Sequence, residues 1–238
     1  MTSIWRVPAA IVLTVLISLP AMADGVLVFG GTGRLGSEVV KELLEVDEKV
    51  IVFARPTSDR DRLQGLDVAY VIGDLLDQNS VIAAFESVRP RIVIDTAALY
   101  GSSYADAARN IIAGAKAVSV KQVILHGSVG AGDNMKLFPS IQGEALVNVL
   151  IDKGHAESAL IESGLPYTII RNGLIEYDDS LSSGNGRITE DRTVLGRITR
   201  VDLAAVSMEC FDEKKCENKI YHATDDSLPV RLPNQEAE

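Results

Sequence analysis

Residues 25–44 read GVLVFGGTGRLGSEVVKELL, and this stretch decides the fold. It opens with a short apolar run, Val26–Phe29, that ends in glycines. Apolar side chains then return at helical spacing over residues 37–46. A glycine-rich turn that directly follows a strand and opens a helix is much more specific than the same glycines out of context. The stretch therefore predicts a strand, a tight glycine turn and a helix.

The glycines of this turn have separate expected roles. Gly30 permits a tight turn, Gly33 lets the backbone approach a pyrophosphate, and Gly36 lets the helix pack against the sheet. The free N–H groups at the helix start would then face a diphosphate. The predicted diphosphate-binding set is Gly30, Thr32, Gly33, Arg34, Leu35 and Gly36. The alternative is a glycine-rich turn without a ligand.

The rest of the chain alternates strand-like and helix-like segments. Further strands are expected at residues 49–53, 68–72, 91–95, 122–126, 167–170 and 219–223. Helices are expected at residues 77–85, with Asp77 as N-cap, and at 105–118, 141–163 and 201–211. Nearly continuous apolar strands are buried on both faces, and their alternation with helices predicts a parallel sheet. We therefore expect one α/β domain over residues 24–238, a doubly wound Rossmann-type sheet with its ligand at the carboxyl ends of the strands.

The end of the second predicted strand indicates which dinucleotide binds. Folds that prefer NAD usually place an acidic residue there for the ribose hydroxyls. This chain has Arg55 instead. A guanidinium suits a 2′-phosphate, and Arg34 could assist from the glycine turn. The sequence thus favours NADP(H) over NAD(H), and the alternative is that Arg55 is a solvated surface residue.

Composition excludes some classes of function. The 238 residues carry a net charge of −10, which argues against nucleic-acid binding. The two cysteines, Cys210 and Cys216, form a disulfide loop or remain two thiols, and the residues leave these alternatives open. Their spacing is wrong for the usual zinc pairs, and with three histidines in the chain we predict no metal site.

The N-terminus resembles an export signal. Arg6 precedes an apolar run over residues 7–19, and Pro20 and an Ala-Met-Ala end follow. This pattern predicts a secretory signal peptide, residues 1–23, cleaved after Ala23, and hence a periplasmic or secreted protein without a stable membrane span. The alternatives are an uncleaved membrane anchor, or translation from Met22 and a cytoplasmic protein. Export conflicts with cofactor binding, because a dinucleotide phosphate does not cross a bilayer unaided.

From Gly25 to about Thr224 the chain resembles an atypical short-chain dehydrogenase/reductase of the NAD(P)H-binding, NmrA-like type. The resemblance rests on the order of GGTGRLG, Arg55, GDLLD, DTAA, HGSVGAG, SGLPYTIIRNG and GRITRVDLAA. It implies contacts to the adenine, the middle of the cofactor and the nicotinamide. The residues at those positions are Asp74 and Leu75, Thr96 and Ala97, and Ser128, with Lys153 on the nicotinamide ribose.

The family pattern breaks at the catalytic tyrosine. Family enzymes that reduce carbonyls carry a Tyr four residues before the Lys, where this chain has Val149. No Tyr occurs within residues 141–163. Tyr100 and Tyr104 are possible substitutes, although we interpret them as loop or substrate-pocket residues. The family's RPG is also changed, to Arg171-Asn172-Gly173, which removes no chemistry.

Two polar residues near these motifs receive structural interpretations. His126 ends a buried strand and could contact substrate, but a hydrogen-bonded structural role is favoured. Asp202 begins the VDLAA helix, where a carboxylate favours the dipole and can cap.

Three functional hypotheses follow. The first is an NADP(H)-dependent oxidoreductase without the usual Tyr, acting on a small-molecule acceptor of quinone, flavin, alkene or carbonyl type, with Ser128 and Lys153 at the reacting ring. The second is a protein that binds or senses NADP(H) without turning it over. The third is an exported scaffold without cofactor. In each case the segment over residues 172–198 is expected to shape the substrate pocket.

Overall fold

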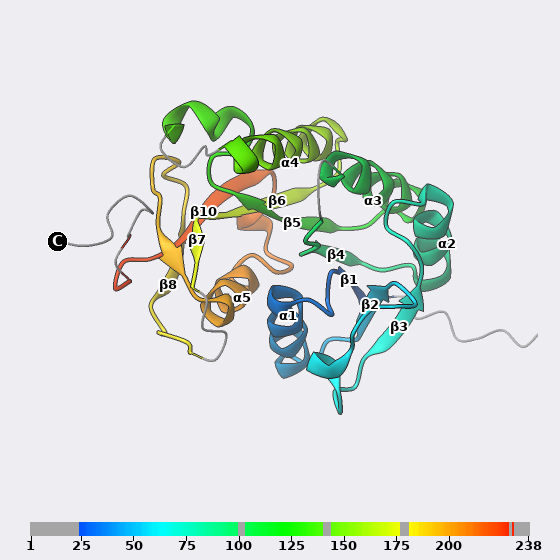
Figure 1. Ribbon diagram of the computed structural model, residues 1–238. Coiled ribbons are helices and arrows are strands. Elements are labelled where there is room, and N and C mark those ends of the chain that lie inside the picture. The colour runs from blue at the N-terminus through cyan, green and yellow to red at the C-terminus, as the bar shows by residue number, and fades with distance from the viewer. Residues whose placement is uncertain (1–23, 100–102, 140–143, 177–180, 229, 231–238) are drawn as a thin grey trace, which may run out of the picture.

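Eight strands form one sheet in the order β3-β2-β1-β4-β5-β6-β10-β8 (Figure 1). The computed structural model describes residues 24–99, 103–139, 144–176, 181–228 and 230, so the predicted leader and Tyr100 lie outside the described residues. The strands of this sheet are β1 (Val26–Phe29), β2 (Val50–Ala54), β3 (Ala69–Ile72), β4 (Ile92–Asp95), β5 (Gln122–Ser128), β6 (Tyr167–Asn172), β8 (Gly186–Thr189) and β10 (Lys219–Asp225). The order reverses direction at β1 and β4, and this switch point is where a ligand is expected.

Helices cover both faces of the sheet (Figure 1). α2, α3 and α4 pack in a row on one face, while α1 and α5 pack together on the other. Their bounds are α1 (Arg34–Glu45), α2 (Gln78–Val88), α3 (Tyr104–Val118), α4 (Glu144–Glu162) and α5 (Arg200–Met208). Short 3-10 turns are η1 (Asp61–Leu63), η2 (Gly132–Leu137) and η4 (Lys214–Cys216). The predicted doubly wound α/β fold is confirmed.

The apolar residues of β1 explain why the sheet lies between two helical layers. Leu27 and Phe29 belong to the core that includes α2 and α3, whereas Val26 and Val28 belong to the core with α1 and α5. All four side chains are fully buried. Successive side chains of a strand point to opposite faces, so a strand that is apolar at every position needs a cover on both sides.

The predicted parallel sheet has one antiparallel strand at its edge. β8 pairs antiparallel with β10, with Ile188 opposite Ala223. A separate small sheet joins β7 (Leu174–Ile175) and β9 (Arg197–Ile198). All three new strands lie in the segment 172–198. They are short, and their partly exposed residues produce no continuous apolar run from which a strand could be predicted.

Helix starts also differ from the predictions. α1 begins at Arg34 rather than at residue 37, because its first turn carries few apolar residues and so lacks helical periodicity. α3 begins at Tyr104, which is therefore a helical residue and not a loop residue. The first three residues of the predicted helix 141–163 lie outside the described part of the chain.

Cys210 and Cys216 form a disulfide, one of the two alternatives that the sequence left open. Both are buried, and with Tyr221 they make a small satellite core beside β10. Gln122 and Thr168 secure this loop, since their side chains donate to the carbonyls of Cys210 and Cys216 at 2.8 and 2.9 Å.

Within the described ranges, no helix is both long enough and apolar enough to cross a bilayer.

Candidate cofactor and active site

The glycine turn lies at the carboxyl end of β1 and begins α1. Gly30 has φ +74°, and a Cβ there would lie 2.7 Å from the backbone of Ala97. A Cβ on Gly36 would lie 2.1 Å from the carbonyl oxygen of Gly30. Both positions therefore require glycine, one for backbone conformation and one for close packing. The N-cap is Gly33, which has no side chain to satisfy the first amides of α1, so those amides suit an anion.

A cavity of about 630 Å³ opens in front of this turn. It runs along the carboxyl ends of β1, β2, β4 and β5, where the sequence places the ligand. Nearly every predicted cofactor residue lines it: Gly30, Thr32, Gly33, Arg34, Leu35, Arg55, Asp74, Leu75, Thr96 and Ala97. Gly36 and Ser128 lie beside the lining rather than in it, since Gly36 packs under the turn and Ser128 sits behind Lys153. The structure thus brings the predicted residues together, while their roles stay predictions.

The GDLLD loop forms one end of the cavity. The carboxylate of Asp74 accepts from the amide of Leu76 at 2.9 Å, and its own amide donates to Ser80 at 3.1 Å. Asn110 from α3 donates to the carbonyl of Leu75 at 2.9 Å. These bonds hold the loop in the place where the adenine is expected.

Arg55 is exposed and follows β2 at the edge of the cavity. Its amide donates to the hydroxyl of Ser58 at 3.1 Å, and both residues line this end of the cavity. The nearby Arg60 is engaged elsewhere, because its guanidinium lies 4.5 Å from the ring centre of Tyr70. The sequence singled out Arg55 among these basic residues and missed Ser58, which only the turn after β2 brings to the cavity.

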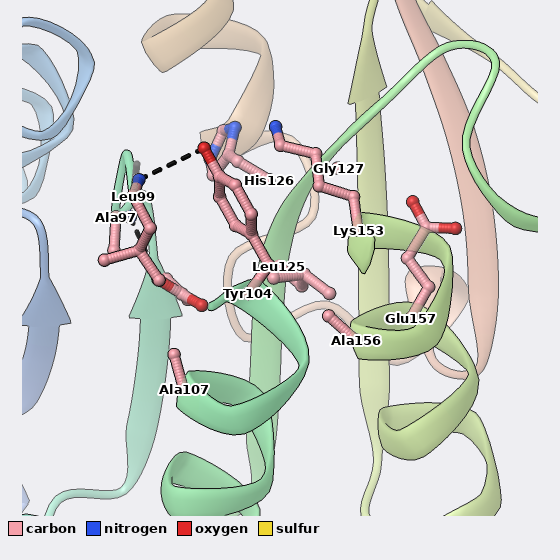
Figure 2. Close-up of a pocket in the computed structure, with 11 residues that line it drawn as sticks. Ala97, Leu99, Tyr104, Ala107, Leu125, His126, Gly127, Lys153, Ala156 and Glu157 are labelled. Carbon is pink, nitrogen blue, oxygen red and sulfur yellow. Dashed lines mark hydrogen bonds between the residues drawn. The ribbon is translucent and has the colours of Figure 1, made fainter. Parts of the chain in front are cut away.

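Lys153, one of the two predicted catalytic residues, lines the opposite end of the cavity, and Ser128 lies beside it. Lys153 on α4 donates to the hydroxyl of Ser128 at 2.8 Å. Burial lowers the pKa of Lys153, partly opposed by the carboxylates of Glu157 and Asp95. Tyr104 also lines the cavity here, with its ring centre 5.0 Å from the Lys153 nitrogen (Figure 2). At this end the sequence missed Asp95 and Arg200, of which Arg200 lines the cavity. Asn172 and Ile175 also line it, and both belong to the segment 172–198 that was expected to shape the pocket.

A second cavity of about 10 Å³ lies behind this end, drawn in Figure 2. Five residues line both cavities and so lie between them: Ala97, Leu99, Tyr104, His126 and Lys153. Asp95 lines only the small one, where burial raises the pKa of its carboxyl to about 6. Asp95 is the first residue of the DTAA motif, so the sequence contains the carboxylate beside the predicted nicotinamide position. Its burial could not be predicted from the motif.

His126 has a defined tautomer. The hydroxyl of Ser207 donates its single proton to the carbonyl of Leu203 at 2.6 Å. It must therefore accept from Nε2 of His126, 3.3 Å away. The other ring nitrogen, Nδ1, is buried without a partner in the described structure. Burial, assisted by the charge of Lys153, lowers the pKa of His126 to about 4. The hydrogen bond to Ser207 gives His126 the structural role that was favoured from the sequence. The ring also lines the cavity, and it is neutral, with Nδ1 as an acceptor.

A buried ion pair connects α4, the helix that carries Lys153, to β6. Arg171 on β6 and Glu157 on α4 are 1% and 2% exposed and lie 2.6 Å apart. Arg171 also contacts Asp133 of η2 at 3.0 Å. Glu157 thus joins the helix that carries Lys153 to the central sheet, a coupling that sequence spacing could not reveal.

Asp202 has the structural role predicted for it. Thr199 is the N-cap of α5 and accepts from the amide of Asp202 at 3.0 Å. Burial alone would raise the pKa of Asp202, but hydrogen bonds from Ser182, Ser183 and Thr199 outweigh burial and hold it at about 2. Asp202 therefore fastens the segment 172–198 to α5.

Comparison with known proteins agrees with this geometry. A family model described as NAD(P)H-binding matches residues 30–214. An uncharacterized chloroplastic protein of Arabidopsis thaliana is 31% identical, over 82% of this chain and 67% of its own length. Sanguinarine reductase of Eschscholzia californica is 27% identical, over 82% of this chain and 87% of its own. Among solved structures, ChuY, an anaerobillin reductase from Escherichia coli O157:H7, has a TM-score of 0.74 at 24% identity and covers 87% of this chain and all of its own.

The matched region contains the glycine turn, the cavity lining and both predicted catalytic residues. The chain therefore belongs to the NAD(P)H-binding family, and its fold is of the Rossmann type.

Proposed function

We propose that this protein is an NADP(H)-dependent oxidoreductase that reduces a small conjugated acceptor. One observation carries the proposal. A single cavity connects Arg55, the glycine turn and Lys153, in the order in which a dinucleotide presents its 2′-phosphate, diphosphate and nicotinamide. The turn supplies close backbone approach and a helix start, the two features that a diphosphate requires. When bound, the cofactor would supply a hydride.

The residues of the chain have separate roles in this proposal. Arg55, with Ser58 beside it, would hold the 2′-phosphate through charge-assisted hydrogen bonds. Lys153 would hold the nicotinamide ribose, with Ser128 fixing its ammonium at 2.8 Å. The aliphatic and aromatic lining at the far end would exclude water and orient the acceptor. Sanguinarine reductase, a relative named for a reduction, supports a reductase reaction, and an acceptor of quinone, flavin, alkene or carbonyl type is part of the proposal.

The first test is a binding titration of NADPH and NADH, followed by nicotinamide fluorescence. The only Trp is Trp5 in the predicted leader, so the cleaved protein gives no competing emission. Arg55→Ala should weaken NADPH binding by about 10- to 100-fold and leave NADH unchanged, since one charged hydrogen-bonding partner is lost. Arg60→Ala is the matched control, because it removes the same charge from a residue that contacts Tyr70. Equal affinity for both dinucleotides, or no effect of Arg55→Ala, would contradict the choice of NADP.

The same preparation separates the alternative functions. NADPH oxidation on addition of a soluble quinone or an aromatic aldehyde supports the oxidoreductase. Tight binding without oxidation by either acceptor supports the sensor, which the valine at position 149 favours. If the protein binds neither dinucleotide, the remaining hypothesis is the exported scaffold without cofactor.

We also propose that the protein is exported and obtains its cofactor outside the cytoplasm, since a dinucleotide phosphate does not cross a bilayer unaided. The supporting contact is the buried Cys210–Cys216 disulfide, a bond that persists in oxidising compartments. The mature N-terminus should then be Asp24, as determined by mass spectrometry of the protein from its native host. An intact leader on a protein recovered from the cytoplasm would contradict export.

A further inference from the structure

The catalytic end of the cavity has Lys153, with Ser128 beside it, but no hydroxyl one helical turn before that lysine on α4. Val149 is the residue one helical turn before Lys153, and it cannot donate a proton. Reduction of a carbonyl or quinone oxygen nevertheless requires a proton as well as a hydride. The question is which described group beside Lys153 can supply it.

Tyr104 presents a phenol at this place from a different helix. It is the first residue of α3, and its ring packs against the Lys153 ammonium at 5.0 Å (Figure 2). The Tyr104 oxygen accepts a hydrogen bond from the amide of Leu99 at 3.1 Å. This bond uses a lone pair and not the proton, so the phenolic proton remains for donation.

The residue before the lysine fixes the tyrosine backbone. Asp152 is 7% exposed, and its carboxylate accepts from the amides of Tyr104 at 2.6 Å and Ala105 at 3.4 Å. The N-cap of α3, Ser103, makes no side-chain capping bond of its own. Asp152 therefore caps α3 from α4, while the adjacent Lys153 contacts the ring. Two successive residues of α4 hold Tyr104 at both its backbone and its side chain.

Other candidates near Lys153 are less suited to donate. The Nε2 proton of His126 is given to Ser207, and Nδ1 carries a lone pair. The hydroxyl of Thr96 donates to the carbonyl of Phe29 at 2.9 Å. Lys153 itself gives one proton to Ser128 and has two left, and Ser128, as the acceptor, keeps its own hydroxyl proton. Lys153 and Ser128 are therefore the rivals that an experiment must exclude.

We propose that Tyr104 is the catalytic proton donor of this protein, taking from α3 the role that α4 lacks. The inference rests on the proposed oxidoreductase function. As a hydride from the reduced nicotinamide reaches the acceptor carbon, the carbonyl π bond breaks and its electron pair moves to oxygen. Tyr104 gives its phenolic proton to that oxygen, so one C–H and one O–H bond form. NADPH is oxidised to NADP⁺, and the phenolate regains a proton from solvent beside the Lys153 cation.

The electrostatic surroundings fit a donor. Burial raises the pKa of the Tyr104 phenol; the Leu99 hydrogen bond opposes this, and the carboxylates of Asp95 and Asp152 reinforce it. Tyr104 therefore stays protonated through neutral pH, which is the state that a reduction needs.

The decisive variant is Tyr104→Phe, which keeps the ring against Lys153 and removes the hydroxyl. Tyr167→Phe is the matched control, because Tyr167 starts β6 at the amino end of the sheet, away from the cavity. Both are compared with wild type for NADPH affinity, for kcat with an aromatic aldehyde and a soluble quinone, and for the solvent deuterium effect on kcat. We expect Tyr104→Phe to bind NADPH within about twofold of wild type and to lose at least about 100-fold in kcat, the lower range for a general acid. Its residual rate should increase with added buffer acid, because external acid replaces the lost donor.

Each outcome decides between the two proposals. A Tyr104→Phe variant that keeps kcat within about threefold, with an unchanged solvent isotope effect, overturns the role of Tyr104 and leaves Lys153, Ser128 or water as the donor. A variant that loses NADPH affinity in parallel with kcat also overturns it, since Tyr104 would then be a binding residue. A wild-type protein that binds no dinucleotide, or that reduces neither acceptor, overturns the oxidoreductase function and the inference with it.

Discussion

Asp95 and His126 should impose opposite pH dependences on the stability of the fold. Each is 9% exposed, and both lie beside Lys153. Burial raises the pKa of Asp95 from 3.8 to about 6, since the ionised carboxylate is poorly solvated, while the Ala97 amide and Lys153 oppose the shift. Burial lowers the pKa of His126 from 6.5 to about 4 for the same reason, with the Lys153 charge adding to it.

The sign of each effect follows from proton linkage. Folding raises the pKa of the Asp95 carboxyl. Its contribution to the free energy of unfolding is therefore fully present below pH 3.8 and is lost as the pH rises through about 6. The His126 imidazole has its pKa lowered, so its contribution is fully present above pH 6.5 and is lost as the pH falls through about 4. At about 1.4 kcal/mol per pKa unit, each amounts to about 3 kcal/mol. Between about pH 4 and 6.5 the two therefore nearly cancel.

Two variants separate the contributions of Asp95 and His126 to the free energy of unfolding. Asp95→Asn keeps an oxygen acceptor for the Ala97 amide, and His126→Gln keeps a donor for Ser207. Urea unfolding, followed by circular dichroism across about pH 4 to 6.5, gives the free energy of unfolding for each protein. Relative to wild type, Asp95→Asn should become more stable by about 3 kcal/mol as the pH rises, and His126→Gln less stable by a similar amount. Titration of all other groups is common to the three proteins and drops out of the difference.

The result that refutes this reasoning is a pH dependence in both variants that matches wild type within about 0.5 kcal/mol, the size of ordinary surface effects. It would mean that neither group changes its pKa on folding, and hence that this end of the cavity is more hydrated than its burial indicates.

Two further predictions concern the supports of the site. Glu157→Gln should lower the free energy of unfolding by about 3 kcal/mol, because it removes the buried partner of the Arg171 guanidinium and leaves only the exposed carboxylate of Asp133, and a urea titration showing less than about 1 kcal/mol would contradict this. Replacing Cys210 and Cys216 with alanine should cost about 2 kcal/mol, the loop-closure entropy of a short disulfide loop, and should lower the melting temperature to that of the reduced wild-type protein. A melting temperature that is unaffected by both reduction and substitution would show that the bond does not form in solution.

Much of the fold and of the cofactor end could be predicted from local sequence. The apolar run of β1, the glycines of the turn and the helical periodicity of α1 are each properties of a few consecutive residues. Arg55 was found because the position after the second strand is defined by the strand itself. Where local pattern was weak, prediction failed, as for β8, whose partly exposed residues gave no signal for its antiparallel pairing with β10.

The catalytic end was decided by tertiary packing. Nothing in the spacing of Tyr104 and Lys153 indicates contact, and the two meet because α3 and α4 pack side by side on one face of the sheet. The same packing makes Asp152 the cap of a helix that it does not belong to. The sequence by itself determined the strand, turn and helix that create a dinucleotide site, because backbone conformation and periodicity are local. Which hydroxyl stands beside the lysine depends on how helices far apart in the chain are laid against one sheet, and only the tertiary structure decides that.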